Sequence, residues 1–149
     1  MLAKGTVYLK NDKGERKATG SYYTPEHIVK YIVEHAVGPV LQEKFETMRP
    51  KMREAQKWHR EMVKLARGKG EPVSKYESGP VVGKRWRGLI DDFFDIKVLD
   101  PAMGSGHFLV EAVDYITDKV LDFLNAFPWN PILAHLEQMR ETILGEMEE

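Results

Sequence analysis

The chain has 149 residues, of which 42% are hydrophobic and 30% are charged, and it contains no cysteine. Its length and composition suit one compact domain, and the lack of cysteine excludes disulfides and thiolate metal sites. No apolar run approaches the roughly 18–20 residues of a membrane span, and the first residues lack the apolar block of a secretory signal. We therefore expect a cytoplasmic protein with no membrane partner.

The net charge of −1 hides a strong division along the chain. Residues 51–87 carry 11 basic and 4 acidic side chains, whereas residues 88–149 carry 3 basic and 13 acidic ones. The basic middle suits contact with phosphate, although a solvated helix face has the same composition. Trp58 and Trp86 lie among these charges and suit either stacking and phosphate contact or a place in the core. The five histidines show no ligand spacing, so we predict no metal site.

The first third predicts a hairpin followed by a helix. Residues 5–20 have the pattern of two short strands around a turn. Thr24 suits the N-cap of the next helix, Pro25 its first position, and Glu26 the positive helix end. An apolar stripe predicts that this helix runs to Gly38 and Pro39, where it should end.

The middle and the end of the chain predict further helices and one strand. A charged helix is expected over about residues 40–66, followed by an exposed loop over residues 67–88 that is rich in glycine, proline and charge. Residues 96–100 predict a short strand, after which a glycine loop leads into a helix that Pro128 ends. Asn130 and Pro131 should cap and begin a last helix, through about residue 144. The predicted buried face of the helix after the glycine loop comprises Phe108, Ala112, Ile116, Val120 and Leu124.

The stretch VLDPAMGSGHFLVEA, residues 98–112, is typical of a strand, a tight turn and a helix N-terminus that hold a nucleotide-like ligand. Gly104 and Gly106 allow a close backbone approach and conformations that other residues disfavour. A P-loop would require lysine and then serine or threonine after Gly106, and the dinucleotide fingerprint would require glycine at position 109, which is leucine. Asp100 at the strand end repels phosphate and attracts an ammonium group. A ligand that carries an amino acid therefore fits best.

Two stretches carry a family resemblance. DPAMGSGHFL resembles the S-adenosylmethionine loop of amino-methylating, adenine-specific DNA methyltransferases, and TGSYYTPEHIVKYIV resembles their upstream cofactor motif. The order of the two motifs is more specific than either alone. The chain is most similar to methylases of restriction-modification systems, namely single-chain restriction-methylation enzymes and type I modification subunits. The resemblance covers about residues 7–40 and 95–115, and Met103 stands where the family commonly has cysteine.

The resemblance implies an α/β fold class, a partial Rossmann-like S-adenosylmethionine-dependent methyltransferase fold that is rich in helix and has few strands. Residues 1–149 would form the amino-terminal part of a methylase domain. Residues 1–38 would contain the hairpin and the upstream-motif helix, residues 39–88 the charged helix and exposed loop, and residues 89–149 the first strand, glycine loop and following helices.

The resemblance also implies the cofactor-binding residues, and it assigns no catalytic residue. Asp100 would face the amino group of the S-adenosylmethionine methionine, and the residues after it would wrap that end of the cofactor. Another group would close the same pocket from the opposite side. The wrapping residues are Pro101, Ala102, Met103, Gly104, Ser105 and Gly106, and the closing residues are Tyr23, Thr24 and Pro25.

Two parts of the family pattern are missing from these 149 residues. One is the acidic residue that grips the ribose, and the other is the asparagine-proline-proline-aromatic motif that holds the flipped adenine. Asn130-Pro131-Ile132-Leu133 shares only two letters with that motif, so we interpret it as a helix cap. The chain is therefore expected to be inactive alone and to act on DNA through an intact restriction-modification enzyme. An RNA or protein methyltransferase of similar fold, or a non-catalytic nucleic-acid-binding module, remain alternatives.

Overall fold

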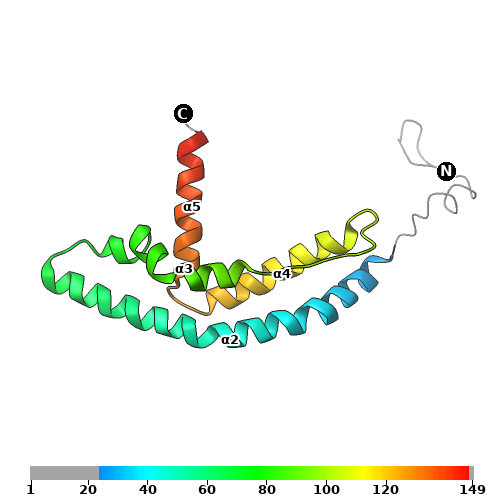
Figure 1. The fold of residues 1–149 in the computed structure, drawn as a ribbon, viewed down its shortest axis with the longest axis horizontal. Helices are drawn as coiled ribbons and strands as arrows, with labels where there is room; N and C mark the ends of the chain where they lie inside the picture. Colours follow the sequence, from blue (N-terminus) through cyan, green and yellow to red (C-terminus); the bar gives the residue numbers. More distant parts are fainter. Residues whose placement is uncertain (1–23, 148–149) are drawn as a thin grey trace, which may run out of the picture.

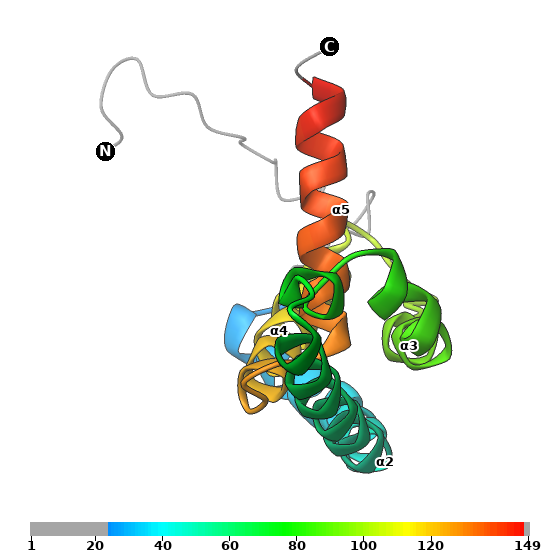
Figure 2. The same cartoon turned by 90° about the vertical axis from the view of Figure 1, so that its left-hand side faces the viewer.

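The computed structural model describes residues 24–147, and the regular structure of that range is entirely helical (Figure 1). A long curved helix, α2, runs the length of the molecule, and α3 and α4 lie on its concave side. The last helix, α5, projects away from the other helices (Figure 2). The elements are α2 (Glu26–Lys69), the 3-10 turn η1 (Val73–Tyr76), α3 (Pro80–Phe94), α4 (His107–Asn125) and α5 (Pro131–Met147).

The predicted α/β, partial Rossmann-like fold class is wrong for residues 24–147, because this range contains no strand. The strand predicted over residues 96–100 is a single irregular segment between α3 and the loop before α4. A strand requires a neighbour to which its amides and carbonyls can bond, and none lies in the described range. Val98 and Leu99 are accordingly 43% and 87% exposed. Their aliphatic character predicted burial without identifying what would bury them.

The predicted end of the first helix at Gly38 and Pro39 is also wrong, since α2 continues through both Pro39 and Pro50. Each proline removes one helical hydrogen bond. Both prolines are exposed, however, while apolar residues before and after Pro39 are buried on the core side of the helix. Burial of this continuous apolar face offsets the lost bonds. The curvature of α2 in Figure 1 is what proline residues on the solvent side of a long helix produce.

The exposed loop predicted over residues 67–88 is largely a turn and a helix. Gly70 ends α2 in the left-handed conformation, with φ of 68°. Gly79 and Pro80 then start α3 in the arrangement that favours a helix N-terminus. The glycines and prolines of this segment therefore mark two helix boundaries. The buried face of α3 comprises Val82, Trp86, Leu89, Ile90 and Phe93.

The predicted buried face of α4 is confirmed, and it is divided between two apolar clusters. Ala112 packs in a small cluster with Val29 and Val33 of α2, beside which Phe108 is partly buried. Leu124 belongs to the main core, in which α2, α3, α4 and the start of α5 meet, and Ile116 and Val120 pack against that core. Helix α2 approaches α4 closely at Gly38, where a Cβ atom would lie 2.8 Å from the Tyr115 Oη atom.

The interpretation of the two tryptophans as core anchors is confirmed. Trp86 is 8% exposed, and Trp58 packs edge-to-face against it with ring centroids 5.9 Å apart. Trp129 joins this aromatic group, and its indole N–H donates to the Glu77 carbonyl at 3.0 Å. The ring of His59 stacks on Trp129 with centroids 4.1 Å apart. Its Nε2 atom is buried without a hydrogen-bond partner in the described part of the chain.

The last helix begins as predicted. Asn130 is buried, and its Oδ1 atom accepts the Leu133 amide at 2.8 Å, which caps the first turn of α5. Its Nδ2 group donates to the Leu124 carbonyl at 3.3 Å, so the same side chain ties α5 to the end of α4. Asn130 and Pro131 are thus a structural corner, as predicted, and not a base-binding motif.

We predict that Asn130→Ala lowers the free energy of unfolding by about 1–3 kcal/mol, because it leaves the Leu133 amide without its cap and removes the bond that ties α5 to the end of α4. Urea unfolding followed by circular dichroism would measure this loss. Asn125→Ala is the matched control, since Asn125 is exposed at the end of α4. Equal stability of the two variants would contradict the role given to Asn130.

Burial of His59 makes the free energy of unfolding depend on pH. Burial lowers the pKa of His59 below its usual value, while the Glu77 carboxylate acts in the opposite direction. The unfolded chain therefore binds a proton more readily than the folded one, so the free energy of unfolding should be full above about pH 6.5 and fall below it. His59→Gln should flatten this dependence below about pH 6.5. His27→Gln, which changes an exposed histidine, should leave it intact, and an unchanged slope in His59→Gln would refute the assignment.

Candidate functional site

The loop between the extended segment and α4 is a compact turn held by two short-range hydrogen bonds. The Asp100 Oδ1 atom accepts the Ala102 amide at 3.0 Å. The Gly106 amide donates to the Met103 carbonyl at 2.7 Å, which closes the turn. Bonds of this kind from an aspartate to the backbone two residues on are typical of tight turns. Residues 100–106 together constitute the glycine loop.

Both glycines of this loop adopt the left-handed conformation expected from the sequence. Their φ angles are +54° for Gly104 and +79° for Gly106. A side chain at either position would meet its own backbone unfavourably. Most of the loop is exposed, so its backbone is open to a ligand. The exposed residues are Pro101, Ala102, Met103, Gly104 and Ser105.

Helix α4 begins at this loop without a side-chain cap. Gly106 occupies the N-cap position, and no side chain bonds to the first turn. The first amides of a helix have no acceptor within the helix, and the helix dipole makes this end positive. The start of α4 is therefore suited to a carboxylate or another anionic group.

Asp100 supplies the opposite charge at the other end of the same loop. Its Oδ1 atom is fixed by the Ala102 amide, whereas its Oδ2 atom is buried and has no hydrogen-bond partner in residues 24–147. A carboxylate oxygen removed from water requires a donor, and a cationic donor satisfies it best. An acceptor for an ammonium group thus lies a few residues before a helix start suited to a carboxylate.

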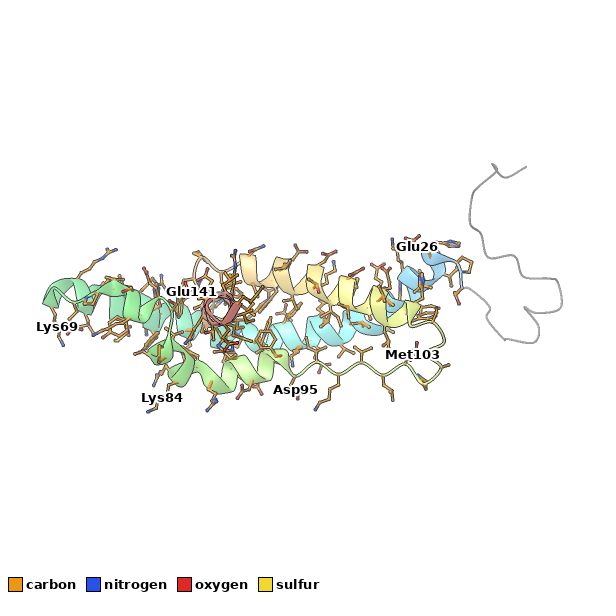
Figure 3. All side chains as sticks on the ribbon, turned by 90° about the horizontal axis from the view of Figure 1, so that it is seen from above. Glu26, Lys69, Lys84, Asp95, Met103 and Glu141 are labelled. Atoms are coloured by element: carbon orange, nitrogen blue, oxygen red, sulfur yellow. The ribbon has the colours of Figure 1, made fainter. Side chains whose placement is uncertain are left out.

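The upstream motif comes to the same end of the molecule as the glycine loop. Figure 3 shows Glu26 at the start of α2 near the end that contains Met103. Thr24 is half-buried and Pro25 is exposed. The predicted capping by Thr24 is wrong, because Pro25 occupies the N-cap position without a side-chain bond. Tyr23 and the predicted hairpin lie outside the described residues.

Charge interactions also join the starts of α2 and α4. The Lys30 ammonium donates to Glu26 at 2.7 Å and lowers the pKa of that carboxyl, mainly through this bond and then through its charge. The charge of His107, the first residue of α4, lowers the same pKa slightly. Eighty-one positions separate Glu26 from His107, so no spacing in the sequence could have predicted that these side chains are neighbours.

Two kinds of feature are absent from residues 24–147. No helix in this range is long and apolar enough to cross a membrane. The same range holds no group of three or more histidine or carboxylate side chains that could bind a metal ion.

Comparison with known proteins gives one informative match. No family profile matches the chain, and no solved structure matches it. A protein of Methanocaldococcus jannaschii, provisionally named a type II restriction enzyme and methyltransferase, is 30% identical over 103 residues. The match covers 68% of this chain but only 8% of that protein. The chain is therefore distantly similar to a small part of a restriction-modification methyltransferase.

We predict that Gly106→Ala destabilises the fold by about 1–2 kcal/mol, because alanine disfavours the left-handed conformation. Gly83→Ala is the matched control. Gly83 lies inside α3 with open space around it, so alanine there should stabilise the helix by roughly 0.5–1 kcal/mol. Urea unfolding of both variants would measure the two effects. A neutral or stabilising Gly106→Ala would show that the loop does not hold this conformation in solution.

Proposed function

We propose that this chain forms part of the S-adenosylmethionine site of an adenine-specific DNA methyltransferase from a restriction-modification system. The buried, unpartnered Oδ2 atom of Asp100, in the loop that leads to the uncapped start of α4, is the observation that carries this proposal. An amino acid bears an ammonium group and a carboxylate on the same carbon. The Asp100 carboxylate suits the ammonium group, and the free amides at the start of α4 suit the carboxylate. The motif order along the chain and the similarity to a named restriction enzyme and methyltransferase support the same function.

The residues present fit the methionine end of the cofactor. Asp100 would accept the ammonium group, and the first amides of α4 would donate to the carboxylate. The Thr24 hydroxyl would supply a second donor from the start of α2. Gly104 and Gly106 would let the loop backbone approach the ligand where a side chain would obstruct it. When bound, S-adenosylmethionine supplies an electrophilic methyl group on its sulfonium sulfur.

The role of this part of the chain is then binding and orientation. The Asp100 carboxylate is held by the Ala102 amide, so one oxygen stays in place for the ammonium group. Helix α4 is fixed against α2 by Ala112 and its neighbours, which holds the loop and the start of α2 at one end of the molecule. Preorganised donors and acceptors of this kind position a substrate without reorganisation at the moment of reaction.

The choice of DNA adenine as substrate rests on the resemblance and on the relative. The chain spans 8% of the length of that relative, so the activity of a whole enzyme is inferred from a small shared part. The 149 residues contain no asparagine-proline-proline-aromatic sequence to hold a flipped base. We therefore expect this chain alone to transfer no labelled methyl group to duplex DNA. Formation of N6-methyladenine by the chain alone would contradict the expectation that base binding requires residues outside these 149.

We predict weak binding of S-adenosylmethionine that depends on Asp100. Titration followed by backbone amide chemical shifts should move the Gly104, Gly106 and Phe108 signals. Asp100→Asn should weaken binding roughly tenfold to hundredfold, because a hydrogen bond to a charged group contributes about 1.5–3 kcal/mol. Asp118→Asn, which neutralises an exposed carboxylate on α4, is the matched control and should bind as the wild type does.

A second ligand tests which end of the cofactor Asp100 recognises. Methylthioadenosine has the nucleoside and the sulfur but no amino-acid group, so Asp100→Asn should not change its affinity. Three results would refute the proposed site: chemical-shift changes remote from the glycine loop, equal losses for the two aspartate variants, or equal losses for the two ligands.

A further inference from the structure

The carboxyl-terminal half of α2 carries a stripe of basic side chains. Successive members are three or four residues apart, so at 100° per residue they fall within a sector of about 80°. At 1.5 Å per residue the stripe is about 21 Å long. All of its members are exposed. The basic stripe consists of Arg53, Lys57, Arg60, Lys64 and Arg67.

The basic stripe lies on the side of α2 that faces away from the core. Ala55 and Ala66 of the same half of the helix are buried, and on a helical wheel they lie across the axis from the stripe. Lys57, Arg60 and Lys64 share one helix face by their spacing along the sequence. The uninterrupted helix extends that face by one residue in each direction, to Arg53 and Arg67.

The stripe has no structural role among the described residues. Within residues 24–147, none of its five side chains forms an ion pair, a hydrogen bond or a cation–π contact. Basic residues earlier on α2 are used differently. Lys51 pairs with Asp92 of α3 at 2.8 Å, and Lys44 donates to the Asp95 carbonyl at 2.9 Å. Like charges three or four residues apart repel each other, so the five cations do not stabilise one another.

The charge on the rest of the molecule directs an anionic partner to this half of α2. Helix α4 carries an acidic row, with Glu111, Asp114, Asp118 and Asp122 at helical spacing. That row would repel a polyanion from the half of the molecule in which α4 packs on the start of α2. The described surface therefore has one end with an acidic row and one with the basic stripe, and a polyanion is attracted more strongly to the end that bears the stripe.

We infer that the basic stripe binds the phosphate backbone of duplex DNA without reading its sequence. The choice of DNA over other polyanions rests on the proposed function. Five unpaired cations spaced about 5 Å apart along one face of a helix suit a row of backbone phosphates. Trp58 and Trp86 pack against each other in the core, so these aromatic rings do not offer a stacking platform for bases. Contacts to phosphate position a protein on DNA and carry no sequence information directly.

Fluorescence anisotropy with a random-sequence duplex of about 20 base pairs, at a series of salt concentrations, would test the inference with this chain. The variant Lys57→Gln/Arg60→Gln/Lys64→Gln should bind more weakly. It should also flatten the slope of log affinity against log salt by up to about 3, since each lost phosphate contact contributes about 0.9. The control is Lys97→Gln/Lys119→Gln/Arg140→Gln, which removes the same charge from exposed positions outside the stripe and should keep the wild-type slope.

Circular dichroism of both triple variants checks that the fold is kept, and glutamine, a good helix former, favours this. The inference is overturned if the stripe variant keeps the wild-type affinity and salt slope, if the two triple variants lose equally, or if polyglutamate displaces the duplex at equal charge. A stripe variant that still binds S-adenosylmethionine but not DNA supports the inference and the proposed site separately. If the chain binds DNA through the stripe but does not bind S-adenosylmethionine, the proposed function is refuted and the inference about the stripe stands.

Discussion

Three phenylalanines, one from each of three helices, hold the centre of this molecule. Phe45 of α2 stacks on Phe123 of α4 with ring centroids 4.4 Å apart and planes 9° from parallel. Phe93 of α3 lies 6.5 Å from the first ring and 6.2 Å from the second. All three are buried, and such pairs contribute about 0.5–1.5 kcal/mol each beyond the burial of their area. Helices α2, α3 and α4 are therefore joined at this stack.

The position of the glycine loop depends on this stack and on the contacts beside it. Helix α4 is anchored near its end by Phe123 and near its start by Ala112 against α2, so its uncapped first turn cannot swing away from α2. The segment that leads into the loop is tied down where it leaves α3, because Lys44 donates to the Asp95 carbonyl. The exposed loop is thereby followed by a helix that is held by packing and preceded by a segment that is held by a hydrogen bond at Asp95.

The sequence predicted local features of this structure better than it predicted their partners. Periodicity identified the buried face of α4, and side-chain chemistry identified Asn130 as the cap of α5. Neither kind of signal shows which element a face packs against. Helix α4 packs on α2 where a sheet was expected, and Val110 and Val113 on its other side remain 63% and 61% exposed.

The errors in the predicted helix boundaries have a related cause. Proline and glycine rules describe local costs, and those rules ended the first helix at Pro39. The apolar residues of α2 on both sides of Pro39 are buried in one continuous core face, and this burial outweighs the lost backbone bond. For the candidate site, the sequence identified the glycines and Asp100. The buried, unpartnered Oδ2 atom and the neighbouring starts of α2 and α4 depend on contacts between distant residues, which no local pattern encodes.

The distance between the two candidate surfaces limits how they could act together. The glycine loop lies near the start of α2, whereas Arg60 is the centre of the basic stripe, and about 50 Å of helix separates Glu26 from Arg60. A duplex lying along α2 would span this distance with roughly 15 base pairs, at about 3.4 Å each. A base near the cofactor would therefore be far from the phosphates held by the stripe. Phosphate contacts at that separation can retain and orient a duplex, but they cannot distinguish which base lies at the cofactor. Binding by the stripe is therefore expected to be independent of sequence.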